Sequence, residues 1–150
     1  MVAYSFQRRF VNPIRLGLGL EQPPEFPLAA GPKRHTIRAD RKRGHAREGD
    51  QLQLFFGLRT RRCKLIGYAR CIGSWPIELV FDDDPESEGV ISPGSGLGQW
   101  GFASFDAFAI GDGFESWQAL KSYWQNERGV ADEFVGVIIF WENCKCTGAS

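Results

Sequence analysis

The residues best suited to chemistry in this chain form one short motif. The stretch Gly-Pro-Lys-Arg-His-Thr-Ile-Arg places Lys33, Thr36 and Arg38 directly after a glycine. If a strand begins at His35, Thr36 and Arg38 share one face and Ile37 points into the core. A point cation, a hydroxyl and a planar cationic fork then meet on one small surface. That set of groups suits an anionic or nucleotide ligand.

Lys33 is also a candidate for acid–base chemistry. Arg34, Arg38 and Arg41 lie close to it in sequence, and like charges lower the pKa of a lysine. A neutral lysine can act as a base, and the Thr36 hydroxyl can be activated as a nucleophile. The alternative is that Lys33 contacts phosphate and Thr36 is an ordinary strand residue.

Basic residues continue beyond the motif, and the charge of the chain is strongly divided. Segment 33–70 carries a net charge of +9 and segment 71–150 a net charge of −10, although the whole chain is neutral. A basic segment that coincides with the motif predicts a face for a polyanion, whereas the alternative is two solvated faces. The candidate nucleic-acid contacts are Lys33, Arg34, Arg38, Arg41, Lys42, Arg43, Arg47, Arg59 and Trp100.

Hydrophobic periodicity predicts many strands and few helices in a single domain, residues 1–150. The N-terminal segment alternates like a strand from Tyr4, and residues 40–49 form a basic loop. Further strands are predicted at 35–39, 50–56, 64–72, 77–81, 104–110 and 134–141. Helices are predicted at 11–18, with Pro13 in the first turn, and at 116–126, and long loops at 19–30 and 82–101.

The order of these features resembles the ASCH domain family of the PUA-like superfamily. The matching residues are Thr36-Ile-Arg38, the basic loop, Gly49-Asp50 with the alternating strand after it, and Asp112-Gly-Phe before a helix and the apolar strand 134–141. The fragment Gly57-Leu-Arg-Thr with Cys63 downstream is similar to a phage or prophage subgroup. The resemblance covers residues 28–142 and implies an α+β, mainly β fold, a small mixed β-barrel with flanking short helices.

The resemblance also implies two classes of function. One is a protein that binds RNA or a nucleotide in a basic cleft around the motif. The other is a hydrolase acting on RNA or on a modified nucleoside. In the N4-acetylcytidine amidohydrolases of the family, the motif lysine and threonine act with a glutamate ahead of the closing helix. These roles carry over to Lys33, Thr36 and Asp112 as catalytic candidates, with an aspartate that is one methylene shorter. The alternative role for Asp112 is that of a turn residue ahead of Gly113.

Several other functions are disfavoured by the sequence. No apolar run is long enough to cross a membrane and the N-terminus lacks a signal-peptide core, so we expect a cytoplasmic protein without a membrane partner. The four cysteines, at 63, 71, 144 and 146, fit no common zinc spacing, so neither a metal nor a cofactor is expected. The glycine pattern at 96–101 matches a dinucleotide motif in letters, but no strand precedes it, and a flexible loop is expected.

The sequence also predicts where the two histidines lie and which aromatic residues contact a ligand. His35 and His45 are expected at the surface beside phosphate rather than in a catalytic triad. Most aromatic residues in a domain of this size belong to the core. Trp100 and Phe102 lie in a glycine-rich loop, however, and are the candidates for stacking on a base.

Overall fold

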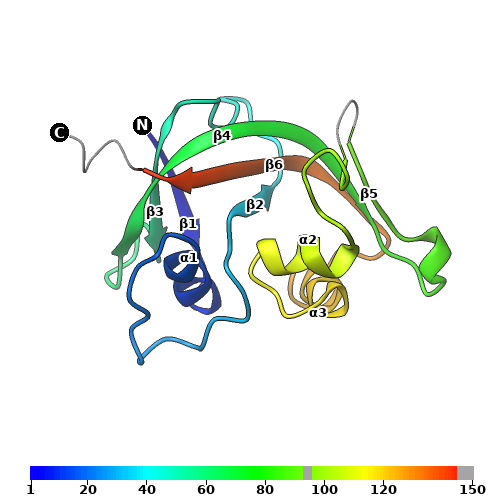
Figure 1. Cartoon of the computed structure of the whole chain (residues 1–150), viewed down its shortest axis with the longest axis horizontal. Coiled ribbons are helices and arrows are strands. Elements are labelled where there is room, and N and C mark those ends of the chain that lie inside the picture. Colours follow the sequence, from blue (N-terminus) through cyan, green and yellow to red (C-terminus); the bar gives the residue numbers. More distant parts are fainter. Residues whose placement is uncertain (93–95, 145–150) are drawn as a thin grey trace.

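The chain folds into one curved sheet with short helices on its concave side. The computed structural model describes residues 1–92 and 96–144. The strands are β1 (Val2–Phe6), β2 (His35–Arg38), β3 (Gln51–Phe56), β4 (Lys64–Val80), β5 (Gly89–Ile91) and β6 (Glu133–Asn143). The α-helices are α1 (Val11–Gly17), α2 (Phe105–Gly111) and α3 (Trp117–Ser122), and short turns of helix are η1 (Arg8–Phe10), η2 (Pro85–Ser87) and η3 (Tyr123–Glu127). The strands β4 and β6 arch across the molecule, and the three α-helices lie beneath them (Figure 1).

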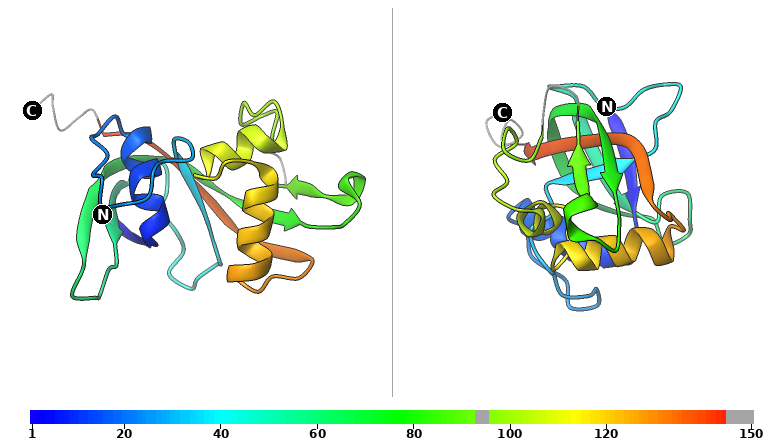
Figure 2. Two further views of the ribbon diagram at one scale, coloured as in Figure 1. Left: turned by 90° about the horizontal axis from the view of Figure 1, so that it is seen from below. Right: turned by 90° about the vertical axis from the view of Figure 1, so that its right-hand side faces the viewer.

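The sheet has the strand order β1-β3-β4-β6-β2, with β5 paired to β4. The β1–β3 pair is parallel and the other pairs are antiparallel. A bulge between Cys71 and Gly73 shifts the register of β4 against β6, and bulges increase strand bending. The sheet curls strongly (Figure 2). No ladder joins β1 to β2 in the described part of the chain, so the sheet is open and a closed barrel is not confirmed.

The core lies between the concave face of the sheet and the helices. Alternation along β3 buries Leu52 and Leu54, and β6 contributes Ile138 and Ile139. Ile37 is buried as expected from its place in β2. The amphipathic face of α1 adds Ile14, so the predictions of these strands and of this helix are confirmed.

The predictions for the long central strand and for the loop after it need correction. Residues 64–72 and 77–81 were predicted as separate strands, but β4 is continuous and still pairs with β6 at Ser74 and Pro76. Proline lacks the N–H donor of a strand residue, but its carbonyl still accepts a hydrogen bond from the Ser92 hydroxyl. The predicted loop 82–101 also contains η2 and β5, while residues 93–95 of it lie outside the described residues.

The predicted strand 104–110 is wrong, because this segment is the helix α2. The Ser104 side chain caps the helix by accepting a hydrogen bond from the Ala107 amide at 3.1 Å. Phe108 and Ala109 are buried and Ile110 is exposed, which is a helical burial pattern rather than the alternation of a strand. The capping serine was therefore the stronger signal, and the apparent alternation was misleading.

The predicted helix 116–126 is present but changes its geometry midway. Ser116 caps α3 by accepting a hydrogen bond from the Ala119 amide at 3.1 Å. From Tyr123 to Glu127 the chain forms a π-helical turn, in which the Arg128 amide donates to the Tyr123 carbonyl at 3.1 Å. Such turns rotate the following side chains and recur at functional sites.

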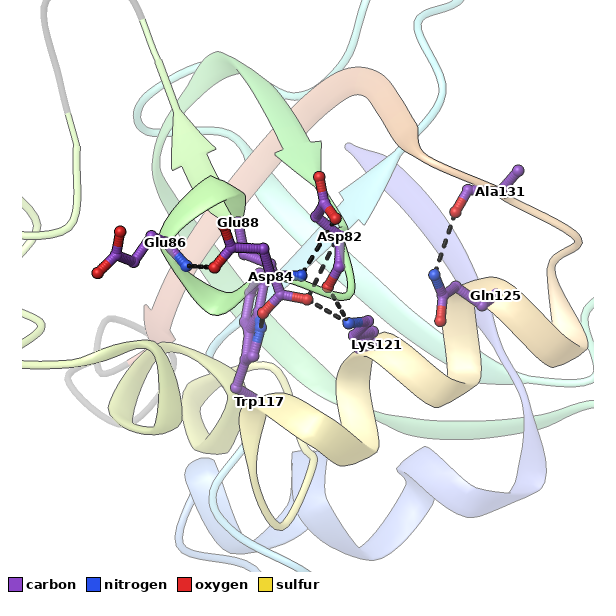
Figure 3. Close-up of polar contacts among 8 residues, drawn as sticks. All are labelled: Asp82, Asp84, Glu86, Glu88, Trp117, Lys121, Gln125 and Ala131. Atoms are coloured by element: carbon purple, nitrogen blue, oxygen red, sulfur yellow. Dashed lines mark hydrogen bonds and ion pairs between the residues drawn. The ribbon is translucent and has the colours of Figure 1, made fainter.

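The arm formed by β5 and the acidic loop before it is tied to α3 by a buried polar network (Figure 3). The Trp117 indole donates to the Glu88 carboxylate at 2.8 Å, and the Lys121 ammonium contacts that carboxylate and the Asp82 carbonyl. Burial alone would raise the pKa of Glu88, but its hydrogen bonds to Lys121 and Trp117 lower it overall. Glu88 is thus a structural ion-pair residue and not a free acidic side chain.

The helices are short relative to a lipid bilayer. Within residues 1–92 and 96–144, none combines the length and the apolar composition that crossing a membrane requires.

Candidate functional site

The end of α2 fixes the position of Asp112. The Gly113 amide donates to the Ile110 carbonyl and the Phe114 amide to the Ala109 carbonyl, both at 3.0 Å, which is the Schellman pattern. Gly113 has a φ of +93°, a conformation that favours glycine. A Cβ at Gly113 would also lie 3.2 Å from the Lys33 side chain, so the glycine lets the two segments approach closely. Asp112 is therefore the turn residue that the Asp-Gly pair suggested, and the turn aims its carboxylate inward.

The Lys33 backbone is held between the first two helices. Its amide donates to the Pro13 carbonyl of α1 at 2.9 Å, and the Arg34 amide donates to the Gly111 carbonyl of α2 at 2.7 Å. The strand β2 then begins at His35. The motif is thus anchored at its start by both helices, which explains how a lysine ahead of the strand can become buried.

Lys33, Asp112 and His35 form a buried triad of polar groups. The Lys33 ammonium lies 2.8 Å from Oδ1 of Asp112 and donates to the Asp112 carbonyl at 2.7 Å. Nδ1 of His35 lies 3.3 Å from the same carboxylate oxygen. The three residues are 2%, 3% and 0% exposed. The Asp112 carboxylate thus pairs with the Lys33 ammonium through a hydrogen bond, while the His35 ring lies at a longer distance on the same oxygen.

Burial shapes the titration of all three groups. The pKa of Lys33 lies below its ordinary value because burial disfavours the ammonium, and Arg38 and Arg9 add to this, while Asp112 opposes it. Burial would raise the pKa of Asp112, but Lys33 and His35 hold it below its usual range. The predicted direction for Lys33 is confirmed. Its main cause is burial, however, rather than the crowding by Arg34, Arg38 and Arg41 on which the prediction rested.

The expected surface position of His35 is wrong. Its ring is fully buried between Phe102, Phe108 and Phe140, with ring centroids 4.9–5.6 Å away. Burial lowers the pKa of His35, so the ring is neutral at neutral pH despite the nearby carboxylate. The site therefore contains a neutral imidazole behind the Asp112 carboxylate. His45, in contrast, is half-buried in the basic loop and hydrogen-bonds the Tyr4 hydroxyl at 3.0 Å.

Thr36 and Arg38 face the same small cavity as the ion pair. The cavity has a volume of about 100 Å³, and its lining residues are Ser5, Phe6, Gln7, Phe10, Lys33, Thr36, Ile37, Arg38, Asp112, Phe114, Tyr123, Trp124 and Arg128. The prediction that Lys33, Thr36 and Asp112 line one pocket, with Arg38 beside them, is confirmed. The Thr36 hydroxyl accepts a hydrogen bond from Nε of Arg38 at 3.3 Å.

Arg38 also bridges the two ends of the sheet. Its guanidinium donates to the Ser5 carbonyl of β1 at 2.7 Å and lies 4.7 Å from the centre of the Phe6 ring. Burial lowers its pKa, although a guanidinium remains protonated at neutral pH. No carboxylate lies within 4 Å of this guanidinium among residues 1–92 and 96–144. Arg38 is therefore a largely buried cation at the cavity without a close acidic partner.

The other predicted contacts are distributed around the molecule. Arg41, Lys42, Arg43 and Arg47 are exposed in the basic loop, and Arg59 is exposed in the turn between β3 and β4. Arg34 and Trp100 line a different cavity, together with Phe102, Ile110 and Phe140. Trp100 packs against Trp75 and Phe140, with ring centroids 6.2 and 5.3 Å away. The structure therefore does not bring Arg34 or Trp100 to the Lys33 cavity.

Three of the cavity-lining residues that the sequence did not predict come from the segment after α3, namely Tyr123, Trp124 and Arg128. Tyr123 and Trp124 fall inside the predicted helix 116–126, and Arg128 lies just beyond it. The π-helical turn η3 turns this segment so that all three meet the cavity. The preceding helical pattern gives no sign of that change in geometry.

The described residues show no arrangement suited to a metal. In residues 1–92 and 96–144, no three His, Cys, Asp or Glu side chains lie close enough to share an ion. Cys63 is exposed, Cys71 and Cys144 are buried, and Cys146 lies outside the described residues.

Comparison of the chain with protein-family models, with curated proteins and with solved structures finds no match.

The buried His35 leads to a pH prediction. Its folded-state pKa is below the ordinary value of about 6.5, so the unfolded chain takes up a proton first as the pH falls. Stability conferred by the neutral ring is complete above about pH 6.5 and declines below it, by up to about 1.4 kcal/mol per pH unit. The His35→Gln variant should lose this part of the slope between about pH 6.5 and 5.

The measurement is urea unfolding across that pH range. Both chains should carry His45→Gln, because burial also lowers the pKa of His45 and gives a slope of the same sign. Equal slopes with and without the His35 substitution would show that His35 is not a buried neutral group.

Proposed function

We propose that this chain binds RNA or a nucleotide, with one nucleotide unit at the cavity formed by Lys33, Thr36, Arg38 and Asp112. The observation that carries this proposal is Arg38. A largely buried guanidinium at a cavity favours an anionic ligand group, because a buried charge is costly without a partner. Lys33 does not attract an anion in the same way, because the Asp112 carboxylate already neutralises its charge.

The surroundings of the cavity support a nucleotide over a simple anion. Phe6, Phe10 and Tyr123 contribute apolar ring surface, which suits a base. Arg128 lines the cavity as a further cation, and Arg9 lies over the Tyr123 ring at 5.1 Å. A bound nucleotide would place its phosphate on the arginines and its base against the aromatic rings.

We also propose that the curved sheet is a PUA-like architecture of the ASCH type. The support is the position of the motif. Its lysine precedes an edge strand, its threonine and arginine face one cavity, and the carboxylate ahead of the last helix completes that cavity. Of the residues on which the resemblance rested, Thr36, Arg38, Asp112 and Phe114 line this one cavity.

The proposal is tested by titrating a labelled single-stranded RNA into the protein at several salt concentrations. Phosphate contacts release counterions, so the logarithm of the affinity should fall linearly with the logarithm of salt. Replacing Arg41, Lys42 and Arg43 by alanine should weaken binding and flatten that slope. Arg70→Ala is the matched control, because Arg70 is exposed and lies 3.9 Å from Glu142.

An affinity that changes neither with the salt concentration nor when Arg41, Lys42 and Arg43 are replaced by alanine would contradict binding through the basic loop. Loss of affinity in Arg70→Ala to the same extent would show a general charge effect instead of a site.

The second candidate is a hydrolase, and the ion pair specifically favours it. A lysine with a lowered pKa, an ionised carboxylate 2.8 Å away and a threonine on the same cavity supply a base, an acid–base partner and a hydroxyl nucleophile. On N4-acetylcytidine, such a set would break the bond between the acyl carbon and N4. Water would supply the hydroxyl to the acyl carbon and the proton to the amine, giving acetate and cytidine.

Turnover separates the two candidates. The protein is incubated with RNA and with N4-acetylcytidine, and Thr36→Val tests the hydroxyl while preserving side-chain shape. Product from the wild-type chain that disappears in Thr36→Val would support a hydrolase. If the wild-type chain and Thr36→Val both bind the ligand and neither gives product, the hydrolase is excluded and the chain is a binding protein.

A further inference from the structure

A second cavity lies where η1, the loop before the motif and the β3–β4 hairpin meet. Its volume is about 230 Å³, and Arg8, Phe26, Phe56, Arg62 and Lys64 line it. We call these five residues the aromatic platform. Three cations around two aromatic rings are an unusual lining for a surface hollow, because aromatic side chains are more often covered by apolar neighbours.

The two rings of the platform are packed together but not covered. Phe26 and Phe56 are half-buried and meet edge to face, with centroids 5.5 Å apart. The guanidinium of Arg8 lies 5.2 Å from the centre of the Phe26 ring, and the ammonium of Lys64 lies 5.9 Å from it. Cations and ring faces are therefore already arranged within contact of one another.

The cations of the platform lack close acidic partners. Arg8 donates to the backbone carbonyl of Glu25, not to its carboxylate. In the part of the chain that the structure describes, Arg8, Arg62 and Lys64 have no carboxylate within 4 Å. The platform thus offers positive charge and ring surface to a ligand that carries both negative charge and flat rings.

The platform lies next to the Lys33 cavity. Phe56 of β3 is the register partner of Phe6 of β1, and Phe6 lines the Lys33 cavity. Partners on neighbouring strands are separated by about 5 Å. Gln7 lines the Lys33 cavity, and Arg8, the next residue, lines the platform. A chain of nucleotides that leaves the cavity would reach the platform directly.

We propose that the aromatic platform is a second contact site for single-stranded nucleic acid. One base stacks on the face of the Phe26 ring, with the nearly perpendicular Phe56 ring at its side, and Arg8, Arg62 and Lys64 contact neighbouring phosphates. Single strands expose base faces that stack on aromatic side chains in this way, whereas the bases of a duplex are already stacked on each other. The inference rests on the proposed function and narrows its ligand from a nucleotide to an oligonucleotide strand.

The test compares a mononucleotide with a single-stranded RNA of about six nucleotides. For Phe26→Leu we expect the affinity for the oligonucleotide to fall by about 5-fold to 150-fold, because one stacked base is lost. The affinity for the mononucleotide, which occupies the Lys33 cavity, should not change. Tyr68→Leu is the matched control, since Tyr68 is an exposed aromatic residue of β4 outside the platform.

A second variant keeps the test informative if Phe26→Leu unfolds. Arg62→Ala with Lys64→Ala removes two exposed cations and should reduce the salt slope for the oligonucleotide by about 1.4, because each phosphate contact to a single strand contributes about 0.7. If the salt slope of this double variant equals that of the wild-type chain, the aromatic platform is not a contact site.

The outcomes separate this inference from the proposed function. If the wild-type chain binds both ligands and Phe26→Leu changes neither affinity, the platform is wrong and the proposed function stands. If the wild-type chain binds neither ligand, the proposed function itself fails. Equal affinity for a duplex of the same sequence would overturn the single-stranded specificity.

Discussion

The Asp112→Ala variant is expected to lose about 3–5 kcal/mol of unfolding free energy, because it leaves the Lys33 ammonium buried without its partner. Asp112 Oδ1 accepts a hydrogen bond from the Lys33 ammonium at 2.8 Å, and the substitution removes this ion pair. Urea unfolding at neutral pH measures the loss. Asp132→Ala is the control, because Asp132 is exposed and its backbone bond to the Phe81 amide survives the substitution.

A double-mutant cycle makes the same prediction more exacting. Lys33→Met should also be strongly destabilising, since it leaves the carboxylate buried. Lys33→Met combined with Asp112→Leu should cost far less than the sum of the losses measured for Lys33→Met alone and Asp112→Leu alone, because apolar residues can replace a buried ion pair. Additive losses would show that Lys33 and Asp112 do not act as a pair in solution.

The Arg38→Met variant is expected to lose most of the affinity for an oligonucleotide. A hydrogen bond to a charged group contributes about 1.5–3 kcal/mol, which corresponds to about a 10-fold to 150-fold loss. Methionine keeps an apolar stem against the Phe6 ring while removing the guanidinium. Fluorescence anisotropy with labelled RNA measures the effect.

Arg38 also hydrogen-bonds the Ser5 carbonyl, so stability must be measured alongside binding. Arg38→Lys is the matched variant. It retains the charge but not the planar fork, and it should recover only part of the affinity. Affinity equal to that of the wild-type chain in Arg38→Met, with the protein folded, would remove Arg38 from the binding site.

The sequence predicted the strands of this fold better than its helices. Alternation in 50–56 specifies β3 because its burial repeats every second residue, whereas the continuous apolar run 134–141 specifies β6, in which the adjacent Ile138 and Ile139 are both buried. The same rule failed for α2, where Ser104 begins a helix that the short aromatic alternation concealed. The bulge at Cys71–Gly73 was also invisible, since continuity of β4 depends on its pairing with β6.

The candidate site was predicted in part for a physical reason. Lys33, Thr36 and Arg38 lie together in the sequence, and a strand of known period fixes their faces. Asp112 was placed by its likeness to a family pattern, because nothing local shows that a turn 79 residues away meets Lys33. His35 was misplaced because its burial depends on Phe102, Phe108 and Phe140, which come from two distant segments.

The most direct test of the central claim is to map where a nucleotide ligand binds. Backbone amide NMR shifts are followed while single-stranded RNA is added to the wild-type chain. We predict that the largest shifts lie in residues 33–38, at Asp112–Phe114 and in the π-helical turn at Tyr123, because these segments enclose the cavity. Shifts confined to the basic loop 41–47, or no shifts at all, would contradict a nucleotide site at the Lys33 cavity.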